Sequence, residues 1–90
     1  MRRPRMRRWV SSASYEAMIK VLVAARHDAG FTQAALAEKL GKPPSFIAKI
    51  ELGERRIDIV EVVALARAMG QDPVKLIEKM VSKLPDRLEI

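Results

Sequence analysis

Four glycines, at positions 30, 41, 53 and 70, divide the greater part of this chain into short segments. Within each segment the apolar residues recur every three or four positions, which predicts amphipathic helices. Glycine commonly follows the last turn of a helix because it enters the left-handed conformation without steric cost. The glycines therefore predict a chain of several short helices, and no segment shows the strict alternation that is typical of a strand.

Capping residues mark where these helices should begin. A serine, threonine or aspartate side chain can accept a hydrogen bond from a free amide of the first turn. The candidate caps are Ser12 or Ser14, Thr32, Asp58 with Glu61 as its capping-box partner, and Asp72 followed by Pro73. Together with the glycines and Pro85, they predict helices over about residues 14–29, 32–40, 44–52, 59–69 and 74–83.

The third of these helices follows two consecutive prolines. A residue that precedes proline is pushed toward an extended conformation, so Lys42 and Pro43 should lie outside the helix. Pro44 has a φ angle close to the helical value and lacks an amide hydrogen that the first turn would leave unpaired. The pair thus predicts a short, stiff turn followed immediately by a helix.

The positive charge of the chain is concentrated at its start. The formal net charge is +6, with 17 basic and 11 acidic residues. Removing the five arginines at the start leaves 12 basic residues against 11 acidic ones, so residues 13–90 are nearly neutral. We expect residues 1–12 to form a flexible basic arm that either serves as a solubilising tail or contacts phosphate. The arginines of this arm are Arg2, Arg3, Arg5, Arg7 and Arg8.

Composition excludes several classes of protein. The absence of cysteine rules out disulfides, thiolate metal sites and cysteine nucleophiles. His27 is the only histidine and has no second ligand at a metal-binding spacing, so we expect neither a metal nor a cofactor. No apolar run is long enough to span a membrane. The arginine-rich and serine-rich start also resembles a transit peptide, which we consider the weaker interpretation because a compact domain begins almost at once.

The second and third predicted helices have the residue order of a helix-turn-helix. Ala37 is small where two helices would approach closely, and Gly41 falls in the turn, where a positive φ is expected. Ile47 and Ile50 face inward from the third helix. A small residue, a glycine and two apolar residues at these offsets form the packing pattern of that motif. The residues alone therefore indicate an all-α, compact five-helix bundle containing a helix-turn-helix.

The stretch "GFTQAALAEKLGKPPSFIAKIELGERR" resembles the helix-turn-helix of the Cro and phage-repressor-like (XRE-type) transcription regulators. The similarity extends back to "AARHDAG" and forward to "LARAMGQDPVKLI", over roughly residues 15 to 78. The resemblance implies a DNA-binding domain, expected over residues 13–84 with a tail at 85–90, that acts as a dimer on a palindromic operator. It also implies a bacterial or phage-derived regulator, most often a repressor, that is cytoplasmic and associated with the nucleoid.

The resemblance assigns roles to individual residues of the second and third helices. Gln33 matches a glutamine that contacts phosphate, which suits the free amides of a helix start. Pro44, Ser45 and Lys49 match the outward positions of the recognition helix, which reads base edges in the major groove. Lys49 can reach the O6 and N7 atoms of guanine, although it could equally hold a phosphate. Proline offers only apolar contacts, so selectivity from this helix should be reduced.

Further roles concern residues on either side of the third helix. Arg26 and Glu51 match an arginine and a glutamate that pair across helices in this family, a structural role. Lys42, Arg55 and Arg56 flank the recognition helix and are expected to contact the DNA backbone, which adds affinity without sequence information. The alternative is that these three are ordinary surface charges. The side chain of Leu52 could be either packed or exposed.

Sequence-specific binding to double-stranded DNA is therefore the function we expect. The alternative is an antitoxin or protein-interaction module that neutralises a toxin or other protein partner. An enzyme is disfavoured, because no cluster of catalytic residue types is present. We also expect a homodimer formed by apolar residues of the C-terminal part: Met69, Leu76, Ile77, Met80 and Val81.

Overall fold

The computed structural model describes residues 12–88, so the predicted arm, apart from Ser12, lies outside the described residues. This part of the chain holds five helices and no strand, in agreement with the predicted fold class. The helices are α1 (Ala13–Asp28), α2 (Gln33–Lys39), α3 (Ser45–Glu51), α4 (Ile59–Ala68) and α5 (Pro73–Ser82). None of them is long and apolar enough to cross a membrane.

Local hydrogen bonds explain where four of the helices begin. The Ser12 hydroxyl accepts from the amide of Tyr15 at 3.1 Å, which decides between the two serines proposed for α1. The hydroxyl of Thr32 and the carboxylate of Asp72 cap α2 and α5 in the same manner. Asp58 and Glu61 form the predicted capping box, in which each side chain accepts from the backbone of the other.

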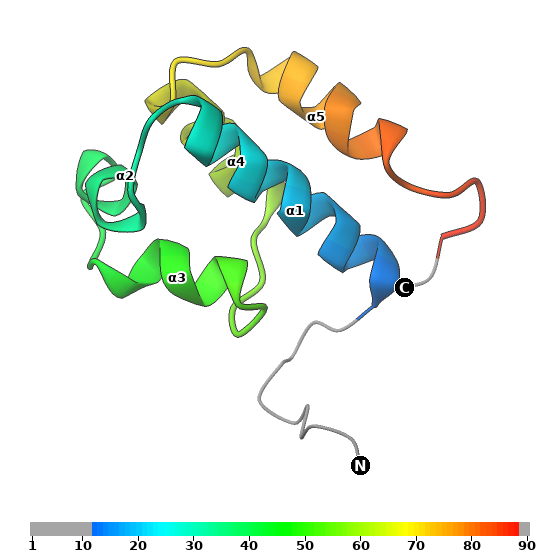
Figure 1. Cartoon of the computed structure of the whole chain (residues 1–90), viewed down its shortest axis with the longest axis horizontal. Coiled ribbons are helices and arrows are strands. Elements are labelled where there is room, and N and C mark those ends of the chain that lie inside the picture. The colour runs from blue at the N-terminus through cyan, green and yellow to red at the C-terminus, as the bar shows by residue number, and fades with distance from the viewer. Residues whose placement is uncertain (1–11, 89–90) are drawn as a thin grey trace.

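The five helices pack around one core that contains residues from every helix (Figure 1). In Figure 1, α1 runs through the middle of the molecule, with α5 along one side and the α2–α3 pair at the other. Contacts between helices follow this arrangement, because α1 packs against both α3 and α5 while α2 packs against α3 and α4. The core side chains with the least exposure are Leu36, Ala37, Ile47, Ile50 and Ala66.

The turn between α2 and α3 has the predicted geometry. Gly41 has a φ angle of 70°, in the left-handed region that favours glycine. Ala37 is fully buried, so its methyl group leaves room for the two helices to approach. Pro44 has φ −57° and ψ −28°, which are helical values, and it occupies the N-cap position of α3 with no capping side chain. The double proline thus sets the start of α3 one residue later than expected.

Several apolar residues lie elsewhere than the sequence predicted. Met69, Leu76 and Met80 were expected at a dimer interface, but they are buried in the core of the protomer at 7%, 4% and 4% exposure. That prediction is wrong for these three residues, because α5 packs against both α1 and α4. Ile59 has the apolar character of a core residue but is 63% exposed at the first position of α4.

Candidate nucleic-acid interface

The outward face of α3 presents three side chains proposed from sequence to read bases. Pro44, Ser45 and Lys49 are all exposed, while Ile47 and Ile50 on the opposite face are each 2% exposed. Leu52 follows the last residue of α3 and is 58% exposed, which answers the question that the sequence left open. The helix therefore divides into a buried apolar face and a short accessible face that carries one positive charge.

A network of three side chains holds α3 against α1 and α2. Arg26 Nε donates to Glu51 Oε2 at 2.7 Å and Arg26 Nη2 donates to Glu51 Oε1 at 3.0 Å, a bidentate ion pair. Both side chains are almost fully covered, with 9% and 11% of their surface exposed. Gln33 Nε2 donates to Glu51 Oε1 at 2.7 Å, and Arg26 Nη1 donates to the carbonyl of Phe31 at 2.9 Å. The structure thus connects Arg26, Gln33 and Glu51, which were all proposed from sequence, through hydrogen bonds to the carboxylate of Glu51.

The ring of Phe46 organises the basic residues beside α3. Lys42 Nζ lies 5.4 Å from the ring centroid, and the guanidinium carbon of Arg55 lies 4.8 Å from it. Both distances fall within the range of cation–π attraction. Phe46 therefore brings Lys42 and Arg55, from either side of α3 in the sequence, to one half-buried ring. Sequence reasoning assigned no role to Phe46, and the signal for this role was its position between the flanking cations.

Arg55 is also held by an acidic residue at the start of α4. Its Nη1 and Nη2 atoms donate to the two carboxylate oxygens of Glu61 at 3.0 and 2.7 Å, and Nη1 donates to the carbonyl of Arg56. The hydrogen bond from Arg55 lowers the pKa of Glu61, and the same bond raises the pKa of Arg55. Because both groups stay charged over a wide range of pH, this pair fixes the loop after α3 to the start of α4.

Tyr15 holds the other end of that loop. The backbone amide of Ile57 donates to the Tyr15 hydroxyl at 2.9 Å, across 42 residues of sequence. The guanidinium carbon of Arg56 lies 5.0 Å from the centroid of the same ring. Arg56 itself is exposed. A single aromatic residue of α1 thus holds both the backbone and a cation of the loop that follows α3, a role that sequence reasoning did not assign to Tyr15.

Comparison with known proteins identifies the arrangement. A family model described as helix-turn-helix matches residues 22–76, more than half of the chain. A solved XRE-family like protein from Pseudomonas syringae pv. tomato is 42% identical, over 81% of this chain and 89% of that one, with a TM-score of 0.74. This chain belongs to the XRE-type helix-turn-helix family of transcription regulators. The sequence-based assignment to that family is thereby confirmed.

A second solved structure has the same fold as this XRE-type regulator. The clp gene regulator ClgR from C. glutamicum aligns over 87% of this chain and 100% of its own length, with a TM-score of 0.69. Its sequence identity is 19%, so this similarity concerns the fold. No curated protein shows significant similarity to the chain.

Membership of this family makes the protein a DNA-binding regulator, and the family is of a non-enzymatic kind. Within residues 12–88, no three histidine, cysteine, aspartate or glutamate side chains come together as metal ligands would. Four positively charged side chains of this XRE-type domain lie on α3 or close to it in the sequence. They are Lys42, Lys49, Arg55 and Arg56.

Proposed function

We propose that this regulator binds a palindromic double-stranded DNA operator as a homodimer and acts as a repressor. The proposal rests on the arrangement of α3. Its exposed outward face bears Ser45 and Lys49, and Glu51 at its end is hydrogen-bonded to α1 and α2. A rigidly held helix with a short polar outward face suits insertion into the major groove. The regulator would work in the bacterial cytoplasm at the nucleoid, without cofactor or catalytic activity.

We assign base reading to Ser45 and Lys49, with Pro44 limited to apolar contact with a thymine methyl group. The exposed side chain of Leu52 at the end of α3 offers a second contact of the same apolar kind. Phosphate contacts are assigned to the cations that flank the helix and to Gln33. Gln33 Nε2 carries two hydrogens and gives one to Glu51, so the second can donate to a phosphate oxygen. The flanking cations are Lys42, Arg55 and Arg56.

Selection of bound duplexes from a random pool, at a stated salt concentration, tests this function. A sequence-specific regulator should enrich one motif, and a dimer should enrich it as two inverted half-sites about 10 base pairs apart, centre to centre. Enrichment of no motif, with affinity that depends only on salt, would exclude the proposed operator-binding function.

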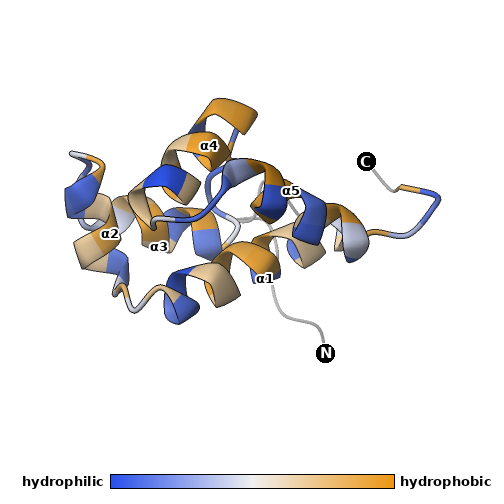
Figure 2. Ribbon diagram, turned by 90° about the horizontal axis from the view of Figure 1, so that it is seen from above, coloured by the Kyte–Doolittle hydropathy of each residue, from blue (hydrophilic) through white to orange (hydrophobic). Residues whose placement is uncertain are grey.

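The homodimer is assigned to an apolar stripe on α5. Val74 is 64% and Val81 60% exposed, and with Ile77 and Glu78 they line one open apolar surface. These apolar residues are spaced at i, i+3 and i+7, so they share one face of the helix. Figure 2 shows that α4 and α5 both carry apolar residues, and the exposed ones on α4 include Ile59 and Val60.

Val81→Glu is expected to shift the protein from dimer to monomer at micromolar concentration while leaving the fold intact. The reason is that a charge on an exposed position of the stripe must be desolvated in the interface but not in the monomer. Sedimentation measures the change, and Leu88→Glu is a matched control because Leu88 is also exposed but lies outside α5. A wild-type protein that is monomeric both free and on DNA would refute the dimer.

The same exposed apolar residues favour a second candidate function. An antitoxin-type module would use the α4 and α5 surface to neutralise a protein partner, with DNA binding retained at α3. The variant Val81→Glu distinguishes the two functions. Loss of partner binding with an unchanged dimer would indicate the second function.

The arm lies outside the described residues and is proposed to contact DNA phosphate. Log affinity plotted against log salt should be less steep for a chain that starts at Ser11 than for the full chain. The expected decrease is about 0.9 for each phosphate that the five arginines neutralise. Equal slopes would show that the arm is a solubilising tail, whereas loss of a preference for A·T-rich flanks would indicate minor-groove reading.

A further inference from the structure

A groove with a volume of about 470 Å³ lies between α1 and α5. Every residue that lines it belongs to one of these helices or lies within two residues of α5. That volume lies within the range of about 300–1,000 Å³ that is usual for small-molecule sites. Its α1 wall is formed by Ala17, Val21, Ala24 and Ala25, which share one helix face. Three of these four side chains are single methyl groups, so the groove stays open where larger side chains would fill it.

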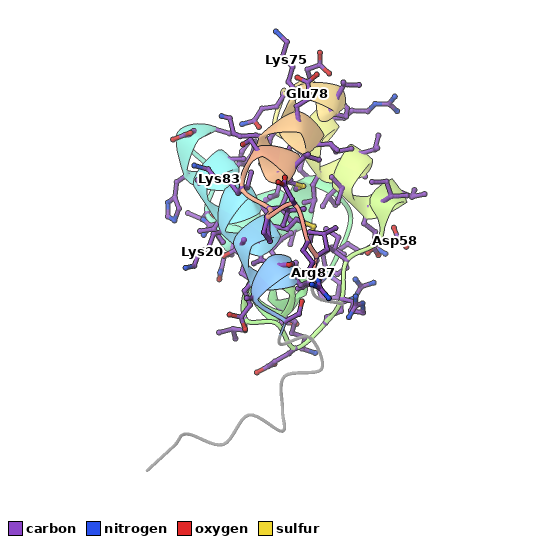
Figure 3. All side chains as sticks on the ribbon, turned by 90° about the vertical axis from the view of Figure 1, so that its right-hand side faces the viewer. Lys20, Asp58, Lys75, Glu78, Lys83 and Arg87 are labelled. Carbon is purple, nitrogen blue, oxygen red and sulfur yellow. The ribbon has the colours of Figure 1, made fainter. Side chains whose placement is uncertain are left out.

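The rim of the groove is positively charged. Lys20 of α1, Lys79 of α5 and Lys83 after α5 all line it, and Asp28 is the one acidic residue among the lining residues. Three positive charges and one negative charge leave a net charge of +2 around the groove. Figure 3 shows Lys20 and Lys83 on the same side of the molecule, extending from neighbouring elements, while Lys75 lies near the far end of α5. An occupant with a negative charge would therefore be attracted to this rim.

The two ends of the groove differ in charge. Gln71 Nε2 donates to the carbonyl of Ala25 at 3.1 Å, which joins the start of α5 to the end of α1. The helices therefore run antiparallel, and Asp28 lies near the Gln71 end. Lys20 is eight residues earlier in α1, about 12 Å along the axis at the rise of an α-helix. The positive charge thus gathers away from Asp28, with the apolar wall of alanine and valine between the two ends.

We propose that this groove binds a small amphipathic carboxylate, a molecule with one carboxylate head and one apolar tail. The head would lie among Lys20, Lys79 and Lys83, and the tail would lie along the alanines of α1 toward Gln71. A purely anionic molecule would leave the apolar wall uncovered, and a neutral one would not use the lysine rim. This site is separate from the candidate DNA interface, since none of its lining residues belongs to α2 or α3.

Titration of the full-length protein with dodecanoate, below its micelle concentration, tests the proposal. Backbone amide chemical shifts in NMR spectra should change saturably and mainly over residues 17–28 of α1, together with Gln71, Lys79 and Lys83. Acetate, which lacks the tail, and dodecyltrimethylammonium, which reverses the head charge, should each bind at least about tenfold more weakly. Equal binding of dodecyltrimethylammonium, or shifts centred on Val74 and Val81, would overturn the proposal by indicating non-specific apolar adsorption.

Two pairs of variants locate the site. Ala24→Leu adds a side chain that would occupy the groove, and we expect it to weaken dodecanoate binding by about tenfold or more. Its control is Ala64→Leu, because Ala64 is an exposed alanine on α4. Lys83→Gln should weaken binding about two- to fivefold, whereas Lys75→Gln, on α5 but outside the groove, should not. Unchanged binding by both groove variants would overturn the proposal, and neither residue is assigned a role in DNA binding.

Discussion

Glu51→Ala is expected to lower the free energy of unfolding by about 3–5 kcal/mol, because it leaves the almost fully covered Arg26 guanidinium without its carboxylate. Arg26 would keep its bond to the carbonyl of Phe31 and the 3.4 Å contact of its Nη2 with Nε2 of His27, and Gln33 would lose the acceptor of its amide. Denaturant or thermal unfolding measures the change. A loss of this size is far above the usual effect of a surface substitution, which is within about 0.5 kcal/mol.

Arg26→Ala and the double variant complete the thermodynamic cycle for this pair. If the two residues act together, the double variant should be less destabilised than the sum of the single losses. Glu54→Ala is the matched control, since Glu54 is an exposed glutamate three residues after Glu51. Single losses that add to within about 0.5 kcal/mol would show that the two side chains are not energetically coupled.

Lys49→Ala is expected to weaken binding to the selected operator by about 1–3 kcal/mol, or about 5- to 150-fold. The reason is that Lys49 is the charged side chain on the outward face of α3, where a bond to guanine would discriminate against other bases. Affinity should be measured for the operator and for its single-base variants. Discrimination should fall at one position of each half-site and be retained at the others.

Lys42→Ala and Arg56→Ala are the comparison variants for Lys49. Both residues are exposed cations beside α3, each placed near an aromatic ring, and both are assigned to phosphate. We expect these variants to weaken binding to all duplexes alike and to reduce the salt slope by about 1. The same uniform loss for Lys49→Ala would show that Lys49 contacts phosphate and does not read bases. Ser45 would then be the remaining polar residue assigned to base reading.

The local features of this fold were predictable from sequence because each depends on residues a few positions apart. The capping box of Asp58 and Glu61 links residues three apart, and the positive φ of Gly41 follows from a turn that only a few residues form. The five helices were predictable for the same reason. The ion pair of Arg26 and Glu51 links residues 25 apart, and it was expected only because the sequence resembles a known family.

Other features were decided only by how the helices pack. Helical spacing places Leu76, Met80 and Val81 in the apolar part of α5, but α1 and α4 cover only the first two. The contact of Gln33 with Glu51, the grouping of Lys42 and Arg55 on Phe46, and the groove between α1 and α5 likewise depend on helix positions. The sequence by itself determined the helices, their caps and the turn, since short-range hydrogen bonds and sterics act within one or two turns. Which side chains meet across helices depends on crossing angles and distances, and only the tertiary structure decides these.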